Sequence, residues 1–287
     1  MRASSYEKGP TPEDVKKADP DDLRLWSVTT VIGALDKPAL VYWAADMTAQ
    51  AAINDLDVWG PLAKKDPAEA QKWLTAARFR KPAGQTRTAA ELGTAVHEAI
   101  ETYTLTGKRP EVDLEVLPYL DQFDAWADRF QPEYQAAEIT VFSPSYGVAG
   151  TCDAFLTVDG VRFIADYKTT RKSFDTKGKP TGPYPEVALQ LAAYRHAEMA
   201  AVWRPRRIEQ FRRRYYLLSA EEQAAAVPVP EVDAGLVIHI TPDHCDAYPV
   251  ECGENVYDSF LYCLEAARWA FDVSKNVLGD RLEKSEV

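Results

Sequence analysis

Two aspartates and a lysine lie close together near the middle of the chain, within a segment that has the pattern of a β-hairpin. Asp153 precedes the first β-prone run, and Asp166 and Lys168 lie at the end of the second. The Asp159-Gly160 pair between the runs is a strong signal for a two-residue turn. Because side chains alternate between the two faces of a strand, we expect Asp166 and Lys168 to point the same way.

This grouping suits a hard divalent cation and a phosphate ester. Carboxylate oxygens are preferred ligands of Mg²⁺, and such a metal lowers the pKa of bound water. We therefore predict one or two Mg²⁺ or Mn²⁺ ions, about 4 Å apart if there are two. The alternative is a surface hairpin with a simple ion pair, and the apolar residues around the motif make that interpretation the weaker one.

Three further segments carry residues that could complete the site. His97 lies one helical turn after Gly93, whose missing side chain would let another group approach the imidazole. Glu138 belongs to a β-prone run before the hairpin and could add a carboxylate to the metal's ligands. Gln190 and Tyr194 lie one turn apart on a later helix and could hydrogen-bond phosphate or metal-bound water. Taken alone, each has a structural interpretation: a buried histidine, a strand-edge charge, and ordinary core or rim residues.

Taken together, these segments resemble the RecB-type branch of the PD-(D/E)XK nuclease superfamily. The resemblance covers residues 93–194, a little over a third of the chain. Any one of its motifs is weak, but their order and spacing make the set specific. The segment 27–45 also looks like the start of phage-encoded members of this group. The matching motifs are Gly-x-x-x-His at Gly93 to His97, Gly-x-x-Asp at Gly150 to Asp153, Asp-x-Lys at Asp166 to Lys168, and Gln-x-x-x-Tyr at Gln190 to Tyr194.

The resemblance implies a restriction-endonuclease-like core and metal-dependent hydrolysis of DNA phosphodiesters, usually by an exonuclease. It also implies a role for each matching residue and makes Glu138 the further acid. The implied roles are metal ligation by His97, Glu138, Asp153 and Asp166, and catalysis by Asp153, Asp166, Lys168, Gln190 and Tyr194.

The cysteines depart from one pattern within this group. Some relatives, including the CRISPR-associated four-cysteine nucleases and the AddB-type subunits, hold an iron–sulfur cluster with one cysteine before the nuclease core and three after it. Here no cysteine precedes Cys152, and Cys245, Cys252 and Cys263 lack tight spacing and a fourth partner. We predict no iron–sulfur cluster and expect free thiols.

The alternation of helical and β-prone patterns predicts an α/β fold with a mixed central sheet flanked by helices and a helical N-terminal portion. We expect residues 1–25 to be a flexible lead-in and residues 26–287 to form a single nuclease domain. Its expected parts are a mainly helical part at 26–130, the catalytic sheet and helix at 131–253, and a C-terminal helix at 254–287.

The expected helices and strands follow from apolar periodicity and turn signals. We expect residues 171–185, which are rich in Gly, Pro and Lys, to form a flexible loop that contacts DNA. The helices are expected near 38–52, 67–80, 88–103, 114–130, 186–203 and 254–278, and the strands near 137–142, 154–158, 161–167, 212–218, 235–240 and 247–250.

Composition limits the class of protein and its partners. A chain of 287 residues with 46% hydrophobic content can bury a substantial core. It has no long apolar run and no signal-peptide core at its start, so we expect a soluble cytoplasmic protein, in the host cytoplasm if it is phage-encoded. The net charge of -11 argues against general adhesion to nucleic acid but permits a local basic channel.

The candidate DNA-binding residues flank the motifs, and contacts of this kind go to phosphates. A second basic stretch, 204–214, could equally be a solvated charged face. The candidates are Arg78, Arg80, Lys81, Arg87, Arg171 and Lys172.

These observations predict a metal-dependent DNA exonuclease that acts in phage DNA recombination or processing. The alternatives are a structure-specific endonuclease of the same fold, a non-catalytic DNA-end-binding protein, and a phosphodiesterase acting on nucleotides or RNA. The candidate partners are linear DNA ends, a recombination or single-strand-annealing protein, and further copies of the chain in a homo-oligomer. We expect no membrane partner.

Overall fold

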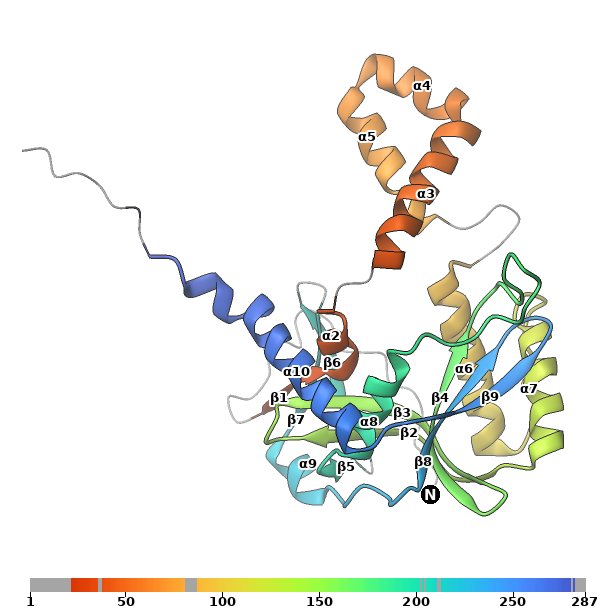
Figure 1. Cartoon of the computed structure of the whole chain (residues 1–287), viewed down its shortest axis with the longest axis vertical. Coiled ribbons are helices and arrows are strands. Elements are labelled where there is room, and N and C mark those ends of the chain that lie inside the picture. The colour runs from red at the N-terminus through yellow and green to blue at the C-terminus, as the bar shows by residue number, and fades with distance from the viewer. Residues whose placement is uncertain are drawn as a thin grey trace, which may run out of the picture. The chain divides into compact units, whose positions relative to one another are not determined.

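The computed structural model describes residues 22–35, 38–80, 87–201, 203, 205–210, 213–279 and 281, together with their side chains except those of 38–40, 78 and 210. Within these residues, one mixed sheet of nine strands runs through the molecule in the order β6-β7-β1-β3-β4-β8-β9, with β2 beside β3 and β5 beside β2 (Figure 1). The strands are β1 Leu23–Ser27, β2 Glu133–Ser143, β3 Val148–Val158, β4 Val161–Thr169, β5 Met199–Ala200, β6 Arg206–Gln210, β7 Arg213–Leu218, β8 Ala234–Ile240 and β9 Cys245–Val250.

The pairing of the strands confirms the predicted mixed α/β fold. The β1–β3 and β4–β8 pairs are parallel, and the remaining pairs are antiparallel. Several helices flank this sheet and contribute to its core. The helices of the chain are α2 Val28–Ile32, α3 Pro38–Asn54, α4 Leu56–Lys65, α5 Pro67–Thr75, α6 Ala89–Thr106, α7 Leu117–Phe130, α8 Val187–Arg195, α9 Ala220–Ala225 and α10 Glu254–Phe271, with 3₁₀ turns η1 Ala77–Phe79 and η2 Val273–Asn276.

The predicted hairpin is β3 and β4. Asp159 and Gly160 have positive φ values of 48° and 80°, which is the backbone of a type I′ turn. This turn matches the right-handed twist of the strands and pairs Val158 with Val161. It fixes which residues of β3 and β4 face each other along the pair.

Helices cover both faces of the sheet where the hairpin lies. Residues of α2, α8 and α10 pack with Ile164 of β4 and with β3 and β8 in the main core cluster. Tyr167 points to the other face, where its ring contacts Phe123 of α7 at a centroid distance of 5.8 Å. Because side chains alternate along β4, Asp166 and Lys168 point the same way, as predicted, and both contact Gln190 of α8.

The chain divides into two compact units, residues 36–95 and the remainder. In the smaller unit, Asp66 caps α5 by accepting hydrogen bonds from the Ala68 and Glu69 backbone at 3.1 Å, with Pro67 in the first turn. The single domain expected over 26–287 therefore remains a prediction. The larger unit contains the whole sheet.

Several expected boundaries differ from the structure. Residues 23–25, assigned to the lead-in, form the start of β1, and residues 1–21 lie outside the described part. Helix α8 ends at Arg195, well before residue 203, and α10 ends at Phe271. Helix α4, β6 and α9 were not predicted. The short strand β6 is polar, so its apolar pattern is too weak to be recognised.

The segment 171–185, which we expected to be a flexible loop, contains a hydrogen-bonded turn, and its flexibility stays a prediction. Asp175 Oδ1 accepts hydrogen bonds from the Lys177 and Lys179 backbone at 2.8 Å and 2.9 Å. An isolated bridge joins Phe174 to Pro180 across this turn. Short-range aspartate-to-backbone bonds of this kind stabilise turns.

No helix among the described residues is long and apolar enough to cross a membrane.

Candidate active site

The site begins at an interruption along one edge of β3. Strand β2 pairs with one edge of β3 almost throughout, while β1 and β4 share the other edge. On that shared edge, β1 pairs with Val148 and Ala149, and β4 pairs from Ala154 onward. Residues 150–153, the predicted Gly-x-x-Asp motif, therefore lie between two pairing partners. Here the backbone is open to groups from other elements.

Asp153 bridges the interruption. Its Oδ2 accepts a hydrogen bond from the Tyr167 backbone of β4 at 2.6 Å. The same oxygen lies 3.6 Å from Nδ1 of His97, which reaches it from α6. The His97 ring also meets the Tyr167 ring edge-on at a centroid distance of 5.9 Å. The structure thus brings the predicted histidine to the first aspartate.

Asp166 is almost completely buried, and three polar contacts hold this carboxylate and its partners together. Gln190 Nε2 donates to Asp166 Oδ1 at 2.6 Å, and Lys168 forms an ion pair with Asp166 Oδ2. Lys168 Nζ also donates to Gln190 Oε1 at 3.3 Å. The amide therefore offers its oxygen to the ammonium and its nitrogen to the carboxylate, the only orientation that satisfies both.

Tyr194 completes this arrangement and explains the glycine of the Gly-x-x-Asp motif. Its buried hydroxyl accepts a hydrogen bond from Gln190 Nε2 at 3.1 Å. A Cβ atom on Gly150 would lie only 2.2 Å from Tyr194 Cε1, so a glycine is required for the ring to lie against β3. Burial, followed by the nearby Tyr216 and Asp166 groups, raises the pKa of Tyr194 well above its ordinary value. The phenol is therefore neutral at physiological pH.

The charges of the site favour a cation. Burial and then the negative charge of Asp166 raise the pKa of Asp153 to about 6, although His97 and Lys168 oppose the shift. Burial lowers the pKa of Lys168, but the Asp166 and Asp153 charges outweigh that effect and raise it overall. Lys168 is therefore an ammonium that only partly compensates two carboxylates.

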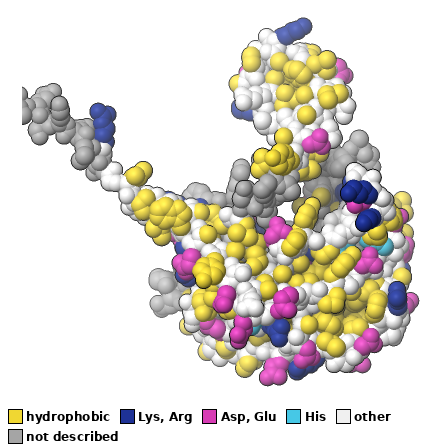
Figure 2. Space-filling model, viewed as in Figure 1, with side chains coloured by type: hydrophobic (Ala, Val, Ile, Leu, Met, Phe, Trp, Pro, Cys, Tyr) yellow, Lys and Arg dark blue, Asp and Glu magenta, His cyan; other side chains and the backbone are white. Residues whose placement is uncertain are grey.

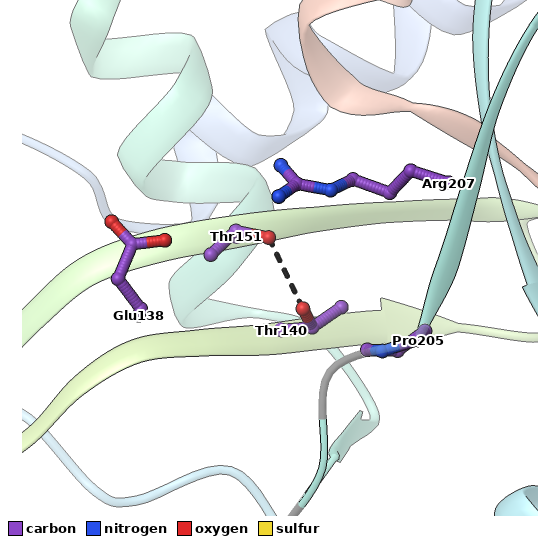
Figure 3. A pocket seen from close by; sticks show the side chains of 5 residues that line it. All are labelled: Glu138, Thr140, Thr151, Pro205 and Arg207. Carbon is purple, nitrogen blue, oxygen red and sulfur yellow. Dashed lines mark hydrogen bonds between the residues drawn. The ribbon is translucent and has the colours of Figure 1, made fainter. Parts of the chain in front are cut away.

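Glu138 occupies an unusual backbone conformation next to this pair. The pairs Ala137 with Ala154 and Ile139 with Cys152 place Glu138 opposite Asp153. Its φ of 53° is left-handed, a conformation that costs a residue with a side chain about 1–2 kcal/mol. Such strain in the middle of a strand is typical of functional positions. Glu138 also lines a small pocket with Thr140, Thr151, Pro205 and Arg207 (Figure 3).

The donor set suits Mg²⁺ or Mn²⁺. Carboxylate oxygens match the preferences of these ions, and the negative charge of Asp166 contributes, after burial, to the raised pKa of Asp153. In the described part of the chain, no three His, Cys, Asp or Glu side chains already converge on a common point. The ion pair of Lys168 contributes to this lack of convergence, because its ammonium contacts Asp166 Oδ2, an oxygen that could otherwise bind a metal.

The cysteines lie mainly in the core. Cys152 is fully buried, and its thiol donates to the Ala154 and Ala165 carbonyls at 3.2 Å and 3.4 Å. Burial raises the pKa of the Cys152 thiol well above its ordinary value. All four cysteines have free thiols in the structure. The absence of an iron–sulfur cluster remains a prediction.

The candidate DNA-binding residues are divided between the two units. Arg171 forms an ion pair with Glu115 at 2.8 Å, whereas Lys172 is exposed. The guanidinium carbon of Arg80 lies 3.4 Å from the centroid of the Trp73 ring. Its Nη1 lies 3.7 Å from Asp55 Oδ2, and all three residues belong to the smaller unit. The remaining candidates also belong to this unit: Arg87 is half-buried, whereas Lys81 and the side chain of Arg78 lie outside the described part.

Sequence reasoning missed a chain of hydroxyl groups next to Asp153. Thr140 and Thr151 lie 3.1 Å apart through their hydroxyl oxygens, and Thr151 lies 3.1 Å from the Tyr216 hydroxyl. Thr151 faces away from its neighbour Gly150, whose Cβ position would meet the Tyr194 ring of α8. Its place within the Gly-x-x-Asp motif is the signal that could have drawn attention to Thr151.

Comparisons with known proteins add little to the fold. The chain matches no protein-family model and no curated protein sequence. Among solved structures, it is similar to one titled "Crystal structure of SSO0001", with 12% identity over 74% of this chain and 72% of that chain. The TM-score of 0.31 is too low to support an argument about fold or site.

The contact between Gly150 and Tyr194 predicts a large effect of one methyl group. Gly150→Ala should lower the free energy of unfolding by about 1–3 kcal/mol, because the added Cβ overlaps a buried ring. Gly93→Ala is the matched control, since a Cβ there meets no atom within 4 Å. Urea unfolding measures both. Equal stability of the two variants would contradict the packing that we describe.

The raised pKa of Asp153 predicts how metal-free stability depends on pH. The folded protein keeps the Asp153 proton up to about pH 6, whereas the unfolded chain releases it near the ordinary value of 3.8. Stability from this group is therefore present at low pH and is lost as pH rises through that interval. Asp153→Asn should remove the loss, and Asp128→Asn, at an exposed position, should not. Urea unfolding in a chelator measures the difference, and parallel pH profiles for wild type and Asp153→Asn would contradict it.

Proposed function

We propose that this chain is a Mg²⁺ or Mn²⁺ dependent deoxyribonuclease that degrades DNA from its ends. One observation carries the proposal: residues from widely separated segments form two sets of contacts, one around Asp153 and one around Asp166, and the charges of these two carboxylates influence each other. His97 reaches Asp153, while Tyr194 and Lys168 both bind Gln190, which binds Asp166. A purely structural ion pair would not need two carboxylates beside one another in the core of a sheet.

His97, Glu138, Asp153 and Asp166 would hold the metal. When bound, the metal supplies an activated water and neutralises charge on the phosphate. Asp153 is already fixed by the Tyr167 backbone, so its second oxygen has a defined direction. Preorganised ligands of this kind reduce the reorganisation needed on binding.

Lys168 would stabilise the negative charge that builds on the reacting phosphate. The Asp166 and Asp153 carboxylates keep its ammonium protonated, and Gln190 positions it through a hydrogen bond of 3.3 Å. Its side chain is 37% exposed, so one side remains accessible to a substrate. A fixed cation in a partly buried site is worth more than the same cation in water.

Gln190 and Tyr194 would act as positioning residues. Gln190 binds both the carboxylate and the ammonium, and Tyr194 holds the second N–H of the same amide. Since these groups are buried or half-buried, their positions should change little when substrate arrives. The exposed Lys172 follows β4 closely and could contact the DNA backbone without reading its sequence.

The first test separates the nuclease from its alternatives. Purified protein with Mn²⁺ should release nucleotides progressively from end-labelled linear DNA and leave covalently closed circles intact. Cleavage of closed circles would replace the exonuclease with an endonuclease. Binding to DNA ends without cleavage of any form would favour the non-catalytic end-binding protein.

Lys168→Ala provides a second test with two readouts. Cleavage should fall by about 10²–10³-fold, because the cation that stabilises the developing charge is gone. Mn²⁺ binding, measured by calorimetry, should become tighter, because the ammonium no longer competes for the Asp166 oxygen. Lys275→Ala, at an exposed position, is the matched control and should change neither quantity. Retained cleavage or weakened Mn²⁺ binding would show that the role of Lys168 is wrongly assigned.

A further inference from the structure

A small pocket opens beside the carboxylates, between β2, β3 and the start of β6. In Figure 3, Arg207 reaches from β6 over the β2–β3 pair, with its guanidinium toward the Glu138 side. Thr140 and Thr151 form the floor, joined by their hydroxyl contact of 3.1 Å. Pro205 completes the lining and is its only apolar residue among those that the structure describes. The pocket therefore offers polar groups, and its described lining has no aromatic ring on which a base could stack.

The floor of the pocket has a hydrogen-bond donor to spare. Thr140, Thr151 and Tyr216 form a chain of three hydroxyl groups with two contacts of 3.1 Å. Each hydroxyl carries one proton, so two protons serve the chain and one can be donated outside it. Thr140 and Tyr216 are buried, which makes an acceptor for that proton favourable.

Arg207 differs from two other arginines on the β6–β7 pair. Arg206 forms an ion pair with Asp22, and Arg214 forms one with Glu209. Arg207 is exposed, and to the other described residues it forms no hydrogen bond or ion pair. A guanidinium that lies over hydroxyl groups without an ion-pair partner suits an anionic ligand.

Glu138 links the pocket to the carboxylates. Glu138, on its rim, lies opposite Asp153 in the β2–β3 pairing. Thr151 precedes Asp153 by two residues, a separation of roughly 6.6 Å along a strand.

We propose that Arg207 and the Thr140–Thr151–Tyr216 hydroxyl chain bind the DNA phosphate next to the one that is hydrolysed. This inference rests on the proposed nuclease function and adds a specific subsite to it. The guanidinium donates to non-bridging phosphate oxygens, and the spare hydroxyl proton donates to another. Arg207 is then a positioning residue that sets the register of the strand over the metal ligands.

Glu138 makes this subsite depend on the cation. Without a divalent ion, its carboxylate repels a phosphate that enters the pocket. A divalent ion held by the proposed ligands, of which Glu138 is one, would neutralise that repulsion, while Arg207 would continue to attract the phosphate. DNA should therefore bind more tightly with a divalent cation, and Arg207 should contribute more in its presence.

The test measures DNA binding and cleavage in variants that remove or keep the positive charge at position 207. Arg207→Gln should weaken binding of a single-stranded oligonucleotide in Ca²⁺ by about tenfold. It should also lower the slope of log affinity against log salt by about one. Arg207→Lys should restore part of the affinity, since it keeps the charge and loses the fork. Lys108→Gln, which removes an exposed charge on the turn after α6, is the matched control and should have little effect.

Replacing single phosphates of the DNA by an uncharged group identifies the phosphate that Arg207 contacts. Oligonucleotides carrying one methylphosphonate at successive positions should reveal one phosphate beside the cleaved bond whose neutralisation weakens wild type. Arg207→Gln should be insensitive to the same substitution. Two outcomes would overturn the subsite and leave the nuclease proposal standing, provided that wild type cleaves DNA. In the first, Arg207→Gln binds DNA as well as Lys108→Gln does. In the second, the loss of affinity from Arg207→Gln and the loss from the methylphosphonate are additive. If wild type binds DNA in this way but never cleaves it, the nuclease proposal is overturned, and with it the place of this phosphate beside a reacting one.

Discussion

A carboxylate buried inside a sheet must be neutralised and hydrogen-bonded, and the environment of Asp166 satisfies that constraint. Lys168 neutralises it, and Gln190 both donates to it and accepts from Lys168. Tyr194 holds the remaining N–H of the amide and requires a glycine at position 150. Removing any member leaves a buried polar group without a partner, which is expensive in a low-dielectric interior.

The sheet makes room for these groups by changing partners. Strand β3 pairs with β1 at its start and with β4 further on, so residues 150–153 lie between two neighbours. In this interval, Asp153 binds the β4 backbone and faces His97. The left-handed Glu138 lies opposite Asp153, on the other paired edge. The proposed chemistry thus occupies the place where regular pairing stops, a position at which side chains can approach a strand from its edge.

Part of this arrangement could be predicted from sequence because it depends on local rules. The Asp159-Gly160 turn, the alternation along β4 and the helical spacing of Gln190 and Tyr194 follow from short-range geometry. Three features depend on long-range contacts and could not be predicted: the close approach of the Tyr194 ring to Gly150, the backbone of Glu138 and the position of Arg207. Boundaries such as the end of α8 were also missed, because apolar periodicity continues past the residue where the helix stops.

The charges on the surface do not indicate where DNA would bind. Figure 2 shows Lys and Arg side chains interspersed with Asp and Glu on the face that it presents, with apolar side chains between them. Several basic residues that the sequence offered as phosphate contacts are occupied elsewhere, as Arg171 is by Glu115. Charge along the chain therefore identifies candidates, but only the fold decides which cations remain available to an anionic ligand.

Diffraction from a crystal grown with Mn²⁺, recorded at the manganese absorption edge, tests the central claim most directly. The account predicts an anomalous peak between the carboxylates of Asp153 and Asp166, with the Lys168 ammonium moved away from Asp166. Manganese bound only elsewhere, with the ion pair between Lys168 and Asp166 unchanged, would contradict it.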